Sequence, residues 1–222
     1  MSPRTPAAAR AGKREQNKQA NRAAILDAAR HCFHEQGYDA ITVRDVIRQA
    51  GLAAGTFYNY FPDKEALFRS LVEERIGALT ARLVAVRRSA DSIEHFLHGA
   101  YRTTFEEIAA NPEFYAMMFR NEAIVRSYFN DSVMGLAMRA LKDDLADAIG
   151  RGLLPEMDVD YLSAMTFGAG YEIARMLTVR PDKSPEEAAV FATRVFLNGL
   201  QAPADQARLI RRGPITHRGS AR

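Results

Sequence analysis

Two side chains in residues 41–66 have the chemistry to recognise a nucleic-acid base. Asn59 carries an amide that can pair with N6 and N7 of adenine, and Arg44 carries a guanidinium fork that can pair with O6 and N7 of guanine. Arg44 has an alternative role as a surface residue paired with Asp45 or with a phosphate. The elements that position these side chains therefore decide what they do.

Residues 42–61 have the pattern of two short helices joined by a tight turn. Thr42 is a suitable cap for the first helix, and Asp45 follows three positions later as its capping-box partner. Gly51 suits the left-handed conformation that ends a helix, and a second helix is predicted to run from residue 53 or 54 to about Phe61. This layout is the one that places a second helix in the major groove of DNA.

The same stretch resembles the N-terminal DNA-binding domain of the TetR family of bacterial transcription regulators. The resemblance is carried by Thr42-Val43-Arg44-Asp45, Ala50-Gly51-Leu52, Gly55-Thr56-Phe57-Tyr58, Tyr60-Phe61 and Asp63-Lys64-Glu65-Ala66-Leu67. It covers roughly residues 20–71; beyond them the family is held together by architecture more than by sequence. It implies an all-α protein, with a three-helix DNA-binding head and a helical body that binds a ligand and a second subunit.

The resemblance also implies which residues contact DNA. Arg44 would reach a guanine, and Asn59 in the second helix is a candidate reader of adenine. Gly55 lets that helix approach the groove, because a side chain there would push the backbone away. The residues at phosphate-binding positions are Thr42, Thr56, Tyr58, Tyr60 and Lys64, and such contacts fix the register without reading sequence.

Periodic apolar residues predict about nine helices in the whole chain and no convincing strand. Asp63 can cap a long helix that runs to about Ala90, with an apolar residue at every third or fourth position. A first helix is predicted from about Gln19 to Gly37, and further helical patterns occupy residues 93–108, 114–129, 133–148, 160–180 and 188–199. We expect a disordered basic arm (1–18), the DNA-binding domain (19–66), a ligand-binding and dimerisation domain (67–201) and a disordered basic tail (202–222).

The middle helices are dense in aromatic residues and methionine, and the resemblance implies that they enclose a ligand cavity. The candidate lining residues are Tyr101, Phe105, Phe114, Met117, Met118, Phe119, Phe129 and Met138, with Arg120 as a candidate polar anchor. The same residue types are also typical of plain core, and Arg120 is equally compatible with a solvated surface position. Residues 111–122 and 167–177 resemble family members that sense fatty acyl thioesters, which implies a lipophilic effector with an acyl chain as one candidate.

The resemblance further implies that the last two long helices pair with their copies in a homodimer. Close approach of helices is favoured by Gly168 and Gly170, and apolar surface is offered by Leu162, Phe191, Val195 and Phe196. The alternative is that the glycines pack inside one subunit.

Composition and charge are compatible with this hypothesis. The 222 residues have a net charge of +3, but residues 1–22 carry a net +5 and residues 205–222 a net +4. Basic ends suit a polyanionic partner such as double-stranded DNA, and solvated ends are the alternative. One cysteine, no apolar run that could cross a bilayer and no signal-peptide pattern favour the bacterial cytoplasm, at the nucleoid, without membrane association.

The sequence favours a dimeric, ligand-responsive DNA-binding regulator over an enzyme. The most compatible activity is repression at a near-palindromic operator, released by a small lipophilic molecule. Activation by the same type of protein is one alternative, and a ligand carrier or hydrolase with a vestigial head is another. No phosphate-binding loop, dinucleotide signature or catalytic triad spacing is present, so we expect no cofactor, no metal and no catalytic residue.

Overall fold

A computed structural model describes residues 6–127 and 133–200, and within these ranges the chain is built from α-helices without a strand. The helices are α1 (Pro6–Gln36), α2 (Val43–Ala50), α3 (Ala54–Tyr58), α4 (Lys64–Ser89), α5 (Ile93–Ala110), α6 (Pro112–Arg120), α7 (Glu122–Ser127), α8 (Val133–Gly150), α9 (Val159–Val179) and α10 (Pro185–Leu200). The all-α prediction is confirmed. In the described ranges, no helix is both long enough and apolar enough to span a membrane.

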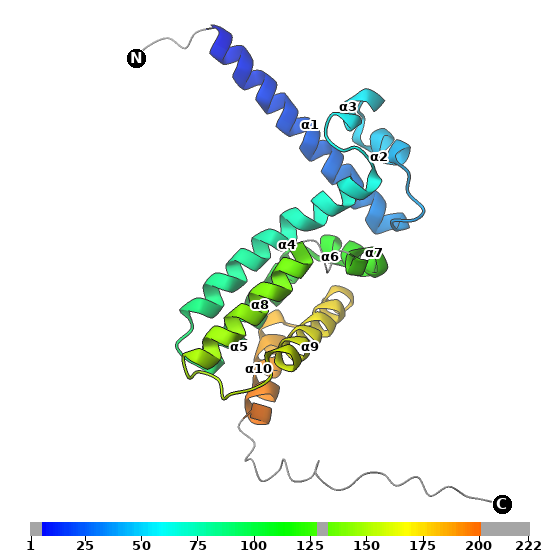
Figure 1. Cartoon of the computed structure of the whole chain (residues 1–222). Helices are drawn as coiled ribbons and strands as arrows, with labels where there is room; N and C mark the ends of the chain where they lie inside the picture. The colour runs from blue at the N-terminus through cyan, green and yellow to red at the C-terminus, as the bar shows by residue number, and fades with distance from the viewer. Residues whose placement is uncertain (1–5, 128–132, 201–222) are drawn as a thin grey trace, which may run out of the picture.

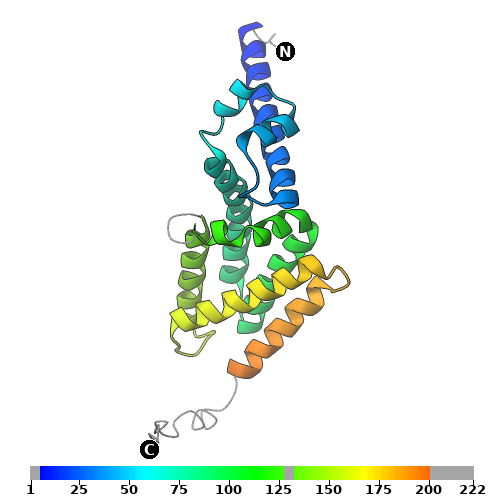
Figure 2. The same cartoon turned by 90° about the vertical axis from the view of Figure 1, so that its right-hand side faces the viewer.

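The helices form a head and a body that share α4 (Figure 1). The head contains α1, α2 and α3, and the N-terminal part of α1 projects beyond the other two helices (Figure 2). From the head, α4 runs into the body, where α5, α8, α9 and α10 lie. The short helices α6 and α7 lie where head and body meet.

Local capping chemistry sets the helix ends in the head. Thr42 and Asp45 form the predicted capping box, in which the Asp45 carboxylate accepts from the Thr42 backbone N–H at 3.0 Å. Gly51 ends α2 in the left-handed conformation at φ +65°, which a residue with a side chain would adopt only under strain. Asp63 caps α4 by accepting from Ala66 N–H at 2.7 Å.

A cluster of aromatic rings holds α1 and α4 together in the head. Phe33 and Tyr38 both meet the ring of Phe68 edge-on, at centroid distances of 5.1 and 5.2 Å. Phe57 of α3 is fully buried, and Val46 anchors α2 in the same core. These anchors hold α2 and α3 against α1.

Three predicted helix boundaries are wrong. First, α1 begins at Pro6 rather than near Gln19, so residues 6–18 are not a disordered arm. Proline is tolerated at the first helical position, and the Ala, Arg, Lys, Gln and Glu residues that follow favour a helix even without an apolar face. Residues 1–5 and the predicted basic tail at 202–222 lie outside the described residues.

The second wrong boundary is the end of α3, which stops at Tyr58 instead of Phe61, so that Asn59 is its C-cap residue. The third concerns residues 114–129, which do not form one helix. α6 ends at Arg120 and α7 begins at Glu122, with Asn121 between them. This break raises the count from the predicted nine helices to the ten described above.

The body helices are tied together by polar contacts between helices far apart in sequence. Glu107 of α5 accepts from Arg75 and Arg82 of α4, at 3.1 and 2.7 Å. Tyr101 of α5 donates its hydroxyl proton to the backbone carbonyl of Thr166 in α9 at 3.1 Å. Its buried hydroxyl therefore has a partner, as burial requires.

Asn121 joins the head to the body at the break between α6 and α7. Its side-chain oxygen accepts from the backbone N–H of Tyr38, just after α1, and its Nδ2 donates to the carbonyls of Phe33 (3.4 Å) and Met117 (2.7 Å). Beside it, Arg120 donates to the carbonyl of His34 at 3.1 Å. One buried amide therefore connects the end of α1 to the end of α6.

We predict that Asn121→Ala lowers the free energy of unfolding by about 1–3 kcal/mol, because it leaves the backbone N–H of Tyr38 without its partner and removes the bonds to the carbonyls of Phe33 and Met117. The measurement is urea unfolding followed by circular dichroism. Arg120→Ala, which removes a single contact at a more exposed position, serves as the graded control and should cost less. An equal or smaller loss for Asn121→Ala than for Arg120→Ala would contradict the linking role of Asn121.

Candidate DNA-binding face and ligand cavity

The outer face of α3 is open to solvent. Phe57 points into the core, whereas the neighbouring Tyr58 side chain is 60% exposed. A side chain added at Gly55 would meet no atom within 4 Å, so the backbone of α3 is accessible at this position. Thr56 is half-buried beside it. A small, exposed helix with an uncovered backbone can enter a groove of DNA.

Arg44 and Asn59, the two candidate base readers, are both exposed. Arg44 does not pair with Asp45, which is bonded to Arg48 at 2.9 Å. The hydrogen bonds of Thr42 hold the pKa of the Asp45 carboxyl below its usual value, and the Arg48 charge acts in the same direction. Asp45 therefore stays ionised as a helix cap, and among the described residues the Arg44 guanidinium has no partner.

Two of the predicted phosphate contacts have structural bonds instead. The Thr42 hydroxyl donates to Asp45 at 2.6 Å, and a hydroxyl has only one proton to donate. The Lys64 ammonium donates to the carbonyls of Tyr38 (2.8 Å) and Ile41 (2.9 Å) and lies over the Tyr38 ring. In this conformation Lys64 mainly fixes the loop between α1 and α2, with one N–H left to donate.

The projecting part of α1 adds polar residues to this face that the sequence reasoning did not select individually. Arg14, Lys18 and Asn21 of α1 line one surface hollow together with Asn59 and Tyr60, which follow α3. The clustering of positive charge in residues 1–22 was the available signal. The charged residues reach the hollow because α1 continues past α2 and α3 as a helix (Figure 2).

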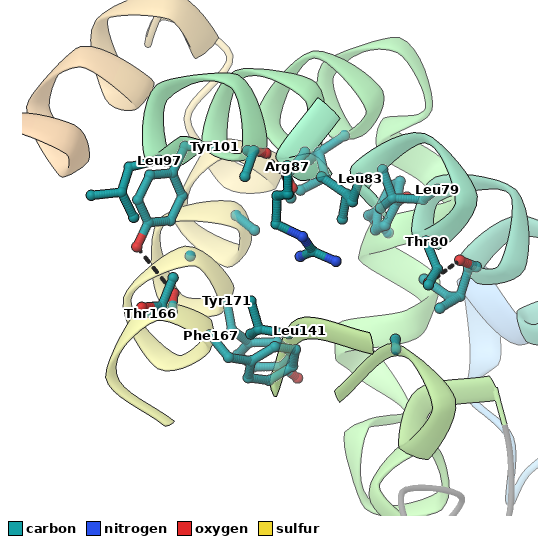
Figure 3. A pocket seen from close by; sticks show the side chains of 18 of the residues that line it. Leu79, Thr80, Leu83, Arg87, Leu97, Tyr101, Leu141, Thr166, Phe167 and Tyr171 are labelled. Carbon is teal, nitrogen blue, oxygen red and sulfur yellow. Dashed lines mark hydrogen bonds between the residues drawn. The ribbon is translucent and has the colours of Figure 1, made fainter. Parts of the chain in front are cut away.

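The body encloses a cavity of about 150 Å³ between α4, α5, α6, α8 and α9 (Figure 3). Its lining is almost entirely apolar, with Leu79, Leu83, Leu97, Leu141 and Phe167 among the residues that face it. Within the described ranges, no group of three or more histidine, cysteine, aspartate or glutamate side chains could hold a metal ion. The cavity therefore has the chemistry of a site for an apolar group.

Three of the nine predicted ligand-binding residues line this cavity: Tyr101, Met118 and Phe119. Phe105, Phe114 and Met117 do not line this cavity and are buried in the core around it. Met138 packs against the core without lining the cavity, and Arg120 faces the head instead. Phe129 lies outside the described residues.

Several lining residues were missed on α4, α5, α6, α8 and α9, and the aromatic ones on α9 pack closely together. Phe167 and Tyr171 stack at a centroid distance of 5.8 Å, and Tyr171 meets Phe119 edge-on at 5.1 Å. Burial raises the pKa of Tyr171 to about 12, so its phenol is neutral at physiological pH. Gly170 leaves room for Tyr101, because an added Cβ would lie 3.1 Å from that ring. Gly170 therefore packs against Tyr101 inside one subunit, which is the alternative that the sequence left open.

The outer sides of α9 and α10 expose large apolar residues, and both helices lie at the front of the body in Figure 2. The exposed residues are Tyr161, Met165, Met176 and Val179 on α9, and Phe191 and Val195 on α10. Gly168 has open space where a side chain would be. Of the other predicted interface residues, Leu162 is buried and Phe196 is half-buried with its ring 6.0 Å from that of Tyr101. Both therefore belong to the subunit's own packing.

Comparison with known proteins agrees with this geometry. Residues 25–71 match the family described as "Bacterial regulatory proteins, tetR family". This segment runs from the middle of α1 into α4 and contains α2 and α3.

A transcriptional repressor of the helix-turn-helix type from Mycobacterium tuberculosis is 42% identical over 79 residues, which are 33% of this chain and 42% of that protein. The chain thus spans less than half the length of this curated relative. The fatty acid degradation regulator FadR of Bacillus halodurans has the same fold, with a TM-score of 0.70 and 24% identity over 82% of this chain and 96% of that one. FadR of Bacillus subtilis, solved in complex with stearoyl-CoA, gives a TM-score of 0.61 at 22% identity, with 81% and 97% covered.

The exposed helix α3, the capped helices around it and the match over residues 25–71 lead to one assignment. Residues 25–71, which contain α2 and α3, belong to the TetR family of bacterial regulatory proteins.

Proposed function

We propose that this protein is a dimeric transcription regulator, acting as a repressor that leaves its operator when a small lipophilic molecule enters the body. The observation that carries the proposal is the exposed face of α3, where Gly55 is open and Arg44 is unpaired nearby. We do not propose an enzymatic activity, because the described residues that line the cavity include no nucleophile paired with a base.

A dimer is required because α3 is short and one copy offers few contacts to DNA. Two copies about 34–36 Å apart would meet successive major grooves on one side of the duplex, which implies a near-palindromic operator. The apolar residues exposed on α9 and α10 supply a surface whose burial would stabilise a two-fold dimer.

The effector would act by shifting a population between two head positions. α4 lines the cavity with Leu79 and Leu83 and packs in the head core through Phe68. A ligand that fits one tilt of α4 better than another therefore favours one spacing of the two heads. A coupling free energy of about 1–3 kcal/mol is typical of such linkage.

The size of the cavity limits the effector in this conformation. A cavity of about 150 Å³ holds a molecule of roughly the size of benzene. Stearoyl-CoA, bound by the Bacillus subtilis neighbour, is far larger, so a long acyl thioester would require the body helices to separate. We therefore propose a smaller amphipathic molecule as effector, and the acyl-chain hypothesis is kept only for short chains.

Two other functions make different predictions. An activator would bind the same DNA but raise transcription from the adjacent promoter, and a reporter assay in a deletion strain separates these two activities. A ligand carrier or hydrolase with a vestigial head would bind no DNA sequence-specifically.

The direct test is fluorescence anisotropy with the full chain and the DNA upstream of its own coding sequence. We expect saturable binding that survives competition by unrelated DNA. Equal binding to the upstream DNA and to shuffled DNA of the same composition would refute the regulator.

For Arg44→Ala we predict a loss of about 1–3 kcal/mol in operator binding and relaxed base preference at one operator position, because a bidentate contact to guanine is removed. Affinities for a set of single-base operator variants measure both effects. The same loss on every variant would make Arg44 a phosphate contact instead.

For Tyr58→Phe we expect weaker binding by about 0.5–1.5 kcal/mol on all operator variants alike, because one hydrogen bond to a phosphate is lost. The same affinity series measures it. A changed base preference would contradict the phosphate assignment of Tyr58.

Charge on the α9–α10 face should separate the subunits. We predict that Met165→Glu combined with Phe191→Glu converts the dimer to a monomer in analytical ultracentrifugation and weakens operator binding, because two charges would be buried in an apolar interface. Leu136→Glu, at an exposed apolar residue of α8, is the matched control and should stay dimeric. A double variant that remains a dimer would refute this interface.

A further inference from the structure

The apolar cavity contains one charged group, the guanidinium of Arg87. This residue of α4 is 4% exposed and faces the cavity, toward Tyr171 and Leu141 in Figure 3. Among the described residues that line the cavity, no other is charged. A buried guanidinium is costly unless its charge and its N–H groups are satisfied.

Asp144 of α8 satisfies only part of this requirement. The Nε atom of Arg87 donates to one carboxylate oxygen of Asp144 at 2.8 Å, and Asp144 is 1% exposed. The other oxygen accepts from Nε of Arg88 at 3.1 Å. One carboxylate thus serves two guanidinium groups, the buried one of Arg87 and that of Arg88, whose side chain is 65% exposed.

The remaining donors of Arg87 are available to a ligand. Among the described residues, the Nη groups of Arg87 have no hydrogen-bond partner. Burial lowers the pKa of Arg87, and Asp144 only opposes this effect, but arginine stays charged at neutral pH. A carboxylate is the group that matches such a fork, since it accepts two parallel N–H bonds.

Two more buried polar atoms at the cavity lack partners within the described part of the chain. They are the Tyr115 hydroxyl, on a residue that is 2% exposed, and Oγ1 of Thr166, on a residue that is 8% exposed. Buried hydroxyl groups are normally hydrogen-bonded. Their position on the lining is a second indication that the cavity takes a ligand with polar atoms.

We propose that the cavity binds a small amphipathic carboxylic acid, whose carboxylate pairs with the Nη groups of Arg87 while its apolar part fills the space between α4, α5 and α9. The cavity volume corresponds to a ligand of roughly six to ten non-hydrogen atoms. This inference rests on the proposed function for the identity of the site, and it adds the chemical class of the effector.

Isothermal titration calorimetry with the full chain at pH 7 tests the class of ligand. The probes are octanoate and phenylacetate, each compared with the alcohol of the same carbon skeleton, 1-octanol and 2-phenylethanol. We expect each acid to bind about 10- to 100-fold more tightly than its alcohol, the range of a charge-assisted pair. Equal binding of acid and alcohol, or no binding of either acid at millimolar concentration, would overturn the proposal.

Variants identify the side chain that binds the carboxylate of the ligand. Arg87→Met should abolish the preference for the acids while the alcohols still bind. Arg82→Met, the same change on α4 at a residue outside the cavity lining, should leave the preference unchanged. Should Arg87→Met fail to fold, Arg87→Met combined with Asp144→Asn removes both buried charges and serves in its place. An acid preference that survives loss of Arg87 would show that Arg87 only joins α4 to α8.

DNA binding is measured separately so that the two proposals fail separately. If the acids bind through Arg87 but leave operator affinity unchanged, the carboxylate site stands and the regulatory proposal falls. If the protein binds its operator but discriminates no acid from its alcohol, the regulator stands and this inference falls.

Discussion

The structure depends on one continuous helix that belongs to both of its parts. α4 has 26 residues and is therefore about 39 Å long. Its first turns complete the core of the head through Leu67, Phe68 and Val72, and its later turns line the cavity through Leu79 and Leu83. Because an uninterrupted helix is stiff, a change of tilt at the cavity must move the head as well. The capping bond of Asp63 fixes where this shared helix begins.

A second connection between the head and the body lies at α6, so the two parts are joined at two places. Met118 and Phe119 of α6 face the cavity, and the next turn ends at Asn121, whose amide holds the backbone around Phe33 and Tyr38. Occupancy of the cavity is thus one helical turn away from the contacts of α1. The connections through α4 and α6 both join the cavity to the head. Because they can shift together, they are a physical basis for linkage between ligand binding and DNA binding.

Features determined by neighbouring residues could be predicted from the sequence, whereas features determined by distant partners could not. The capping box of Thr42 and the left-handed Gly51 depend on residues at most four positions away, and both were confirmed. Among the predicted lining residues, Tyr101 faces the cavity and Phe105 does not, although the two have the same residue class and helical face. Arg87 was missed because a charge in a long helix usually indicates solvent, and its partner Asp144 lies on another helix.

The central claim is that α4 holds two copies of α3 at one fixed separation. It is tested most directly by selecting half-sites from random DNA and measuring affinity while the spacer between two half-sites is changed by one base pair at a time. The account predicts one sharp optimum, with half-site centres about 10 base pairs apart or a multiple of this, because each added pair rotates the second site away from its head. An affinity that is independent of spacing would mean that the heads move freely, and would contradict the account.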